Sequence, residues 1–204
     1  MRYKLSVLIP VFNEEKTILE VIRRVKNVKL TNLAKEIIIV DNFSTDNTRT
    51  ILSNLNDKNI KVFYHKINIG KGAAIRTALK HASGNIILIQ DADLEYNPKD
   101  YVKLLEPIVS NNAKVVYGSR VLGNKKANYA RFSYYVGGMS LTLIFNLLYG
   151  TKLTDIACGY KVFYVDIIKN LNLKCKSFEF DVETTSKIIR KGIKIVEVPV
   201  SYIP

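Results

Sequence analysis

Three acidic side chains at alternate positions are the clearest candidates for chemistry in this chain. Asp91, Asp93 and Glu95 follow directly after the apolar run NIILI at 85–89. Residues two apart in an extended segment point the same way, so Asp91 and Asp93 could share one hard cation. Mg²⁺ typically takes one or two protein carboxylates and completes its shell with water and substrate phosphates. The stretch is therefore either a metal and diphosphate site or an Asp-rich turn with helix capping before Pro98.

The overall composition is that of a globular protein with a strong positive charge. The 204 residues suit one large domain, and 48% of them are hydrophobic and 24% charged. The formal net charge of +13 indicates a polyanionic partner, which could be nucleic acid, a phosphorylated substrate or an anionic membrane surface. Carboxylates gathered at one point of so basic a chain need a specific explanation.

Several familiar metal and nucleotide motifs are missing from the sequence. Cys158 and Cys175 form neither a metal-ligand spacing nor a disulfide framework, and they favour a reducing compartment. The two histidines cannot supply a multi-histidine metal site. The Gly-x-Gly at 70–72 lacks a third glycine and follows the third strand, not the first, which argues against a dinucleotide fold. No Walker pattern occurs.

The elements that must position these residues alternate along the first 120 residues. Short apolar runs predict strands at 4–11, 36–41, 60–65, 85–93 and 114–120. Apolar residues at helical spacing predict helices at 14–28, 44–55, 71–82 and 98–112. A further strand is expected at 196–202, after an uncharged helix-like stretch that begins at 132. Five β units separated by helices predict an α/β fold with a largely parallel sheet covered on both faces.

Each of the first five strands is followed by a loop rich in acceptors, glycines or charges. The loops read PVFNEE, DNFSTDNT, NIGKGAA, DADLEYNP and GSR. Parallel sheets bind ligands in a crevice at the carboxyl ends of their strands. We therefore expect these five loops to meet around one ligand site.

The ordered set of motifs resembles the inverting family-2 glycosyltransferases. The set comprises PVFNEE, IIIVDNFSTDNT, GKGAA, DADL and GSR, followed by TDIACGYKVF, FEFDVE and EVPVSY, and it covers essentially the whole chain. Within that family the chain looks like the dolichyl- or polyprenyl-phosphate hexose synthases. The resemblance implies the GT-A fold. It also implies a single catalytic domain, with a nucleotide-sugar-binding part at 1–120 and an acceptor-binding part at 121–204.

The resemblance further implies roles for the matching residues. The nucleotide-sugar-binding candidates are Pro10, Val11, Asn13, Glu14, Asp41, Lys71, Asp91 and Ala92. The candidates for a divalent cation, Mg²⁺ or Mn²⁺, are Asp91, Asp93 and Glu95. The catalytic candidates are Asp93, Arg120, Asp155 and Asp181, and Glu183 shares the FEFDVE motif with the last of them. The candidates for the acceptor phosphate are Arg120 and Arg131.

Three positions depart from the usual pattern of the family. Asn42 stands in the second loop where relatives usually carry a second aspartate, so the contacts to the base differ there. Glu95 stands where many relatives carry glutamine. Relatives with lipid-phosphate acceptors often carry an arginine in the helix after the basic loop, where this chain has Gly138 and Met139. Arg131, slightly upstream, is the candidate to replace it.

A phosphate acceptor would simplify the chemistry. Such an acceptor already carries an ionised oxygen near pH 7, so the site needs positioning and charge stabilisation and no strong general base. The expected reaction is metal-dependent, inverting transfer of a hexose, mannose or glucose, from a GDP- or UDP-sugar to dolichyl or polyprenyl phosphate. A saccharide or protein-glycan acceptor would instead require a carboxylate base, for which Asp155 and Asp181 are the candidates.

The region from 107 to 154 favours a membrane surface as a partner. It holds six basic residues and no acidic one, and it encloses the uncharged stretch. A basic loop beside an apolar helix could dock on an anionic membrane, here at the cytoplasmic face, with the helix lying in the interface. The alternative is a core helix beside a solvated lysine loop. No stretch reaches the roughly 18 to 20 apolar residues that span a bilayer.

A non-catalytic module that binds nucleotide sugars or nucleic acid is the remaining alternative. The aromatic residues are scattered along the chain and form no stacking platform, and no RNA-binding motif occurs. We therefore expect no nucleic-acid partner.

Overall fold

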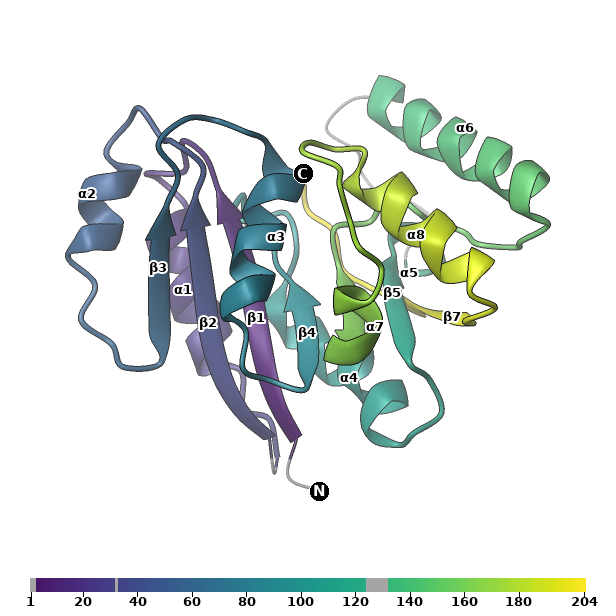
Figure 1. The fold of residues 1–204 in the computed structure, drawn as a ribbon, viewed down its shortest axis with the longest axis horizontal. Helices are drawn as coiled ribbons and strands as arrows, with labels where there is room; N and C mark the ends of the chain where they lie inside the picture. The colour runs from purple at the N-terminus through teal and green to yellow at the C-terminus, as the bar shows by residue number, and fades with distance from the viewer. Residues whose placement is uncertain (1–2, 32, 124–131) are drawn as a thin grey trace.

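One seven-stranded sheet organises the protein (Figure 1). The computed structural model describes residues 3–31, 33–123 and 132–204. The strands in these ranges are β1 (Tyr3–Val11), β2 (Leu33–Asp41), β3 (Ile60–Tyr64), β4 (Ile86–Ile89), β5 (Val115–Ser119), β6 (Lys161–Tyr164) and β7 (Ile195–Pro199). Their order across the sheet is β3-β2-β1-β4-β6-β5-β7. The second part of the chain therefore contributes β6 and β7 to the same sheet as the first.

The predicted α/β fold with a largely parallel sheet is confirmed. β1 runs parallel to β2 and β4, β2 runs parallel to β3, and β5 runs parallel to β7. Only β6 is antiparallel to its two neighbours, β4 and β5, among the pairings of the described strands. Because β6 opposes both neighbours, β4 and β5 still point the same way. The loops after β1, β2, β4 and β5 therefore emerge at one edge of the sheet.

β6 is the strand that the sequence pattern did not predict. It has four residues, and its inner positions pair with β4 and β5 across long stretches of chain. A run this short carries no periodicity that separates strand from loop. The strand expected at 196–202 forms as β7, which begins one residue earlier and ends at Pro199. Tyr202 continues as an isolated bridge to Tyr96.

The predicted helices all form, and two of them begin later than expected. The helices in the described ranges are α1 (Ile18–Asn27), α2 (Thr48–Ser53), α3 (Lys71–His81), η1 (Pro98–Asp100), α4 (Tyr101–Val109), α5 (Arg120–Gly123), α6 (Phe132–Tyr149), α7 (Val165–Lys169) and α8 (Phe180–Arg190). The sequence pattern did not predict α5, α7 and α8. Residues 14–17 and 44–47 precede α1 and α2 as non-helical segments of turns and bends. These turns lengthen the two loops that follow β1 and β2 at the ligand edge.

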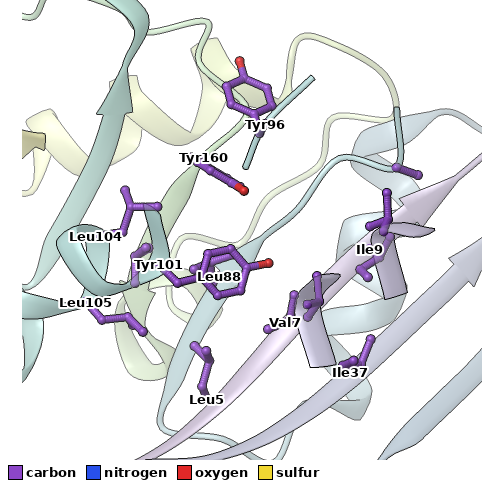
Figure 2. Packing of buried hydrophobic residues seen from close by; sticks show 14 of the residues in the cluster. Leu5, Val7, Ile9, Ile37, Leu88, Tyr96, Tyr101, Leu104, Leu105 and Tyr160 are labelled. Atoms are coloured by element: carbon purple, nitrogen blue, oxygen red, sulfur yellow. The ribbon is translucent and has the colours of Figure 1, made fainter. Parts of the chain in front are cut away.

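The sheet is buried on both faces because its strands are apolar at successive positions. Leu5, Val7 and Ile9 on β1 are fully buried in one cluster, together with side chains of α1 and α4. Leu8 is fully buried in the other cluster, with side chains of α3 and α8. Figure 1 shows α3 and α8 in front of the sheet and α1 behind it, and Figure 2 shows the cluster that contains Tyr101. Each such aliphatic side chain stabilises the fold by about 1.5–3 kcal/mol.

A buried carboxylate ties β1 and β2 together. Glu36 on β2 accepts hydrogen bonds from the Ser6 hydroxyl at 2.6 Å and from the Ser83 backbone N–H at 2.8 Å. Lys61 lies 3.1 Å from its other oxygen. Burial alone would raise the pKa of Glu36, but the hydrogen bonds from Ser6, Ser83 and Lys61 outweigh it and lower the pKa to about 2. Glu36 is therefore ionised in the folded protein at every physiological pH.

The lowered pKa of Glu36 predicts a stability that falls in acid. A depressed carboxyl pKa contributes stability above the unfolded-state pKa near 4.3, and that contribution is lost as pH falls towards 2. Glu36→Gln should therefore lower the free energy of unfolding by roughly 2–3 kcal/mol at pH 7, and the gap should close towards pH 2. Urea unfolding from pH 2 to 7 measures this, with exposed Glu106→Gln as the matched control. Parallel pH profiles for wild type and Glu36→Gln would contradict it.

Candidate functional site

A pocket of about 450 Å³ opens where β1, β2 and β4 end. Its lining residues are Pro10, Val11, Phe12, Glu14, Asn42, Asn68, Gly70, Lys71, Asp91, Ala92, Asp93, Ser177 and Phe178. The loops after these three strands and the first turn of α3 supply most of the residues that line the pocket. The structure thus gathers into one cavity these residues proposed from the sequence for nucleotide-sugar and metal binding: Pro10, Val11, Glu14, Lys71, Asp91, Ala92 and Asp93.

An ion pair between Lys71 and Asp91 forms one wall of the pocket. The Lys71 Nζ lies 2.6 Å from Asp91 Oδ1. Burial would lower the pKa of Lys71, but the charges of Asp91 and Asp181 outweigh it and raise the pKa above its usual value. The ammonium group is therefore a permanent positive charge beside the cavity. It connects the N-terminus of α3 to the end of β4.

Asp91 is held in place by close packing against Gly159. A Cβ built on Gly159 would lie 2.1 Å from Asp91 Oδ2 and 3.2 Å from the ring of Tyr96. The Gly159 N–H donates to the Tyr96 hydroxyl at 3.1 Å. Residue 159 must therefore be glycine for the carboxylate to occupy this position. The TDIACGYKVF motif contributes a wall behind Asp91 as well as polar residues of its own.

Asp93 is an exposed carboxylate that lines the pocket together with Asp91. Partial desolvation at the pocket wall and the charge of Asp91 raise the pKa of Asp93 to about 7, although the Glu95 N–H donates to Asp93 Oδ1 at 3.0 Å and opposes the shift. Two neighbouring carboxylates that repel each other are the hard oxygen donors that Mg²⁺ or Mn²⁺ prefers, and a cation would relieve the repulsion. These two residues fit the divalent cation that the resemblance implies.

Glu95 faces another partner. Within the described ranges, no three His, Cys, Asp or Glu residues form a group that could hold a metal ion. The Glu95 carboxylate interacts with Tyr202, and burial together with this carboxylate raises the pKa of Tyr202 to about 12. The proposed role of Glu95 as a metal ligand stays a prediction. Asp91 and Asp93 therefore offer two protein carboxylates, which is the number that Mg²⁺ commonly takes.

Asp41 and Asn13 support the loops around the pocket and do not line it. The Asp41 side chain is fully buried, with one oxygen 3.0 Å from the Arg49 Nε. It also accepts hydrogen bonds from the Ser44 N–H. Asn13, with a φ of 56°, accepts from the Thr45 N–H at 2.8 Å. In this structure the Asn13 side chain fastens the first two loops to each other, and the Asp41 side chain holds its own loop to α2. Their proposed contacts with the nucleotide remain a prediction.

A network around Asn42 explains the departure from aspartate at that position. The Ile69 N–H donates to Asn42 Oδ1, and Asn42 Nδ2 donates to Asn68 Oδ1 at 2.7 Å. The Gly70 N–H also donates to Asn68 Oδ1. Backbone N–H groups therefore fix the orientation of both side-chain amides, Asn42 and Asn68. His65 Nδ1, 2.9 Å from Asn42 Oδ1, must then be the donor. An aspartate at 42 would place a carboxylate oxygen against Asn68 Oδ1, so the amide is required by its neighbours.

Arg120 and Asp155 form a separate centre beside the pocket. The guanidinium donates from Nε at 2.7 Å and from Nη2 at 2.8 Å to the two oxygens of Asp155, which is 3% exposed. The Tyr202 ring lies 5.3 Å from the Arg120 guanidinium carbon. Because Tyr202 also forms a β-bridge with Tyr96, it connects this centre to the loop that carries Asp91 and Asp93. Arg131 lies outside the described residues.

Asp181 and Glu183 at the start of α8 are both engaged by neighbours. Asp181 lies 2.6 Å from the ammonium of Lys161, a lysine with no exposed surface that also donates to the carbonyls of Ile156 and Cys158. Glu183 accepts from the Cys175 N–H at 2.7 Å. Lys161 was not proposed from the sequence, although a lysine inside the apolar run GYKVF could have indicated a buried ion pair.

The segment 174–178 closes the pocket and was also not proposed. A Cβ on Gly70, whose φ is 93°, would lie 2.3 Å from the Lys176 carbonyl oxygen. The Ala73 N–H donates to that same oxygen at 2.9 Å. The glycines of GKGAA are therefore needed for close approach of this segment. Ser177 and Phe178 follow it into the pocket wall, and Phe178 is 75% exposed.

The contact between Asp91 and Gly159 gives a direct prediction. Gly159→Ala should push the Asp91 carboxylate away from Lys71, which should lower the free energy of unfolding by about 1–3 kcal/mol. The same change should weaken Mn²⁺ and nucleoside diphosphate binding at least tenfold in calorimetric titrations. Gly137→Ala on α6 is the control, because a Cβ there meets nothing within 4 Å. Equal binding by Gly159→Ala and wild type would contradict this assignment.

The chain is similar to proteins that act on dolichyl phosphate. It is 32% identical over 216 residues to UDP-N-acetylglucosamine--dolichyl-phosphate N-acetylglucosaminyltransferase of Methanococcus voltae, covering 97% of this chain and 84% of that protein. It is 29% identical to dolichyl-phosphate beta-glucosyltransferase ALG5D of Trichomonas vaginalis, covering 97% of this chain and 65% of that protein.

Solved structures show the same fold. Glucosyl-3-phosphoglycerate synthase from Mycobacterium tuberculosis, in complex with Mn²⁺, UDP and glucosyl-3-phosphoglycerate, matches with a TM-score of 0.73 at 20% identity. The match covers 99% of this chain and 72% of that one. The expected GT-A fold is confirmed by this likeness. The sequence pattern of glycosyl transferase family 2 matches residues 6–171, and the chain therefore belongs to this family.

Proposed function

We propose that the protein transfers a sugar, with inversion, from a nucleotide sugar to a dolichyl or other polyprenyl phosphate. The observation that carries this proposal is the pocket in which Lys71, Asp91 and Asp93 lie together at the ends of the strands. The names of the dolichyl-phosphate relatives support the acceptor. The sugars to be tested are glucose and N-acetylglucosamine, which these names contain, and mannose, which the resemblance implies.

The donor would lie in the pocket with its diphosphate at the end of β4. Asp91 and Asp93 would hold the divalent cation, which when bound supplies charge stabilisation to the departing nucleoside diphosphate. The Lys71 ammonium offers a second positive charge at the same place. Phe12, which is 43% exposed, and the oriented amide of Asn42 line the far part of the pocket and would contact the base.

The acceptor phosphate would bind to Arg120. An ionised phosphate oxygen attacks the anomeric carbon, the bond from that carbon to the diphosphate breaks, and the nucleoside diphosphate leaves. Since the phosphate is already ionised near pH 7, no residue has to remove a proton. Asp155 keeps the Arg120 guanidinium in one orientation through two hydrogen bonds. The chain thus acts by positioning two anions and stabilising charge.

A saccharide acceptor is less well supported by the site. That reaction would need Asp155 or Asp181 as a base. Asp155 is paired with Arg120 and Asp181 with Lys161, so protonation of either carboxylate would weaken an ion pair that the structure contains. The phosphate acceptor avoids this requirement.

The outer face of α6 would lie in the membrane interface that carries the acceptor. Leu143, Ile144, Leu147 and Leu148 are between 54% and 77% exposed, while Phe145 on the inner face is 3% exposed. Figure 1 shows α6 outermost, beyond α8. In the described chain, no helix combines the length and apolarity needed to cross a bilayer. An uncharged helix with an apolar face suits peripheral binding, and the basic charge of the chain suits the anionic cytoplasmic leaflet.

Transfer itself is tested with purified protein, a polyprenyl phosphate in detergent and a panel of UDP-glucose, UDP-N-acetylglucosamine and GDP-mannose. We expect one donor to give glycolipid with Mn²⁺ or Mg²⁺ and none after EDTA. Asp93→Ala should lower kcat at least a hundredfold, because charge stabilisation at the leaving group is lost. Donor binding without glycolipid from any of the three sugars would reject the lipid acceptor.

Membrane binding is tested by sedimentation with anionic vesicles that contain a polyprenyl phosphate. Leu147→Ser with Leu148→Ser should lower the partition coefficient at least tenfold, because two exposed apolar side chains would no longer enter the interface. Val102→Ser on α4 is the matched control, since Val102 is 57% exposed on another part of the surface. An equal decrease of the partition coefficient in the α6 variant and the Val102→Ser control, or no decrease in either, would argue against α6 as the docking face.

A further inference from the structure

A carboxylate on β7 holds the backbone that carries Asp155. Glu197 Oε1 accepts hydrogen bonds from the N–H groups of Thr154 and Asp155, both at 3.0 Å. Its other oxygen accepts from the Thr154 N–H at 2.8 Å. Hydrogen bonds from backbone N–H groups to an ionised carboxylate are stronger than those between neutral groups. Glu197 therefore fixes the start of the 154–158 segment to the sheet.

The same carboxylate is placed by the strand that leads to Arg120. β7 pairs in parallel with β5, where Glu197 lies opposite Tyr117 and Pro199 opposite Ser119. Arg120 follows Ser119 directly, and the Ser119 hydroxyl lies 2.7 Å from the Thr154 hydroxyl. The register of these two strands thus brings the anchor of the 154–158 segment alongside the residue that the segment must meet.

Asp155 transmits this anchoring to the guanidinium. It accepts three hydrogen bonds from Arg120: from the backbone N–H at 3.1 Å, from Nε at 2.7 Å and from Nη2 at 2.8 Å. Asp155 is 3% exposed, so water offers it few alternative partners. A shift of the Asp155 backbone would therefore change the orientation of the Arg120 guanidinium group.

We infer that Glu197 is a positioning residue for Arg120, acting through Thr154 and Asp155. The inference rests on the proposed function in one respect, because it assigns Arg120 to the acceptor phosphate. Glu197 itself does not line the donor pocket. Its removal should therefore affect use of the acceptor and leave binding of the donor nucleotide unchanged.

The orientation of Arg120 can be followed without turnover. In protein labelled with ¹⁵N-arginine, the Arg120 Nε–H resonance is assigned with Arg120→Lys and reports the bond to Asp155. Glu197→Ala should shift this resonance or broaden it beyond detection. Glu197→Gln should retain it, because an amide oxygen can still accept the two bonds made by Oε1. Exposed Glu106→Ala is the matched control and should leave it unchanged.

Kinetics separate positioning from folding. Glu197→Ala should lower kcat/KM for polyprenyl phosphate at least tenfold, with the Kd for the nucleoside diphosphate changed by less than twofold, and Glu197→Gln should recover most of the loss. An unchanged Arg120 resonance in Glu197→Ala would overturn the inference. So would equal losses of Tm and nucleotide binding in both Glu197 variants, which would indicate a purely structural role. If wild type makes no glycolipid, the proposed function fails, and the resonance comparison still decides the role of Glu197.

Discussion

The ion pair between Lys71 and Asp91 is the contact on which the site depends. It joins the start of α3 to the end of β4 at 2.6 Å, in a pocket that Asp93 also lines. An isolated buried carboxylate would be costly, and the ammonium makes its burial tolerable. The same pair leaves positive and negative charge at the wall of one cavity. That arrangement suits a diphosphate and a cation together.

The second half of the chain determines where this pair can lie. Gly159 leaves space for the Asp91 carboxylate, and the Lys176 carbonyl packs on Gly70 at the start of α3. Lys161 then ties the carbonyls of Ile156 and Cys158 to Asp181 at the start of α8. The donor pocket is therefore built by the first part of the chain and braced by the later part.

Much of this arrangement could be predicted from the sequence, for an identifiable reason. Apolar runs and helical spacing indicate parallel strands, and the loops after parallel strands share an edge, so Pro10, Lys71 and Asp91 could be expected to meet. β6, the partner of Lys161 and the role of Glu197 could not be predicted, because each depends on pairing between distant segments. The burial of Asp41 beneath Arg49 is a similar case, since no local pattern distinguishes a loop aspartate that faces a ligand from one that faces its own loop.

The central claim is that a divalent cation and a nucleoside diphosphate occupy the Lys71, Asp91 and Asp93 pocket together. Crystals grown with UDP and Mn²⁺, with data collected near the manganese absorption edge, test it most directly. The account predicts an anomalous peak at the Asp93 carboxylate, with the diphosphate between that peak and the Lys71 ammonium. Nucleotide bound at another surface, or bound in this pocket with no manganese near either aspartate, would contradict it.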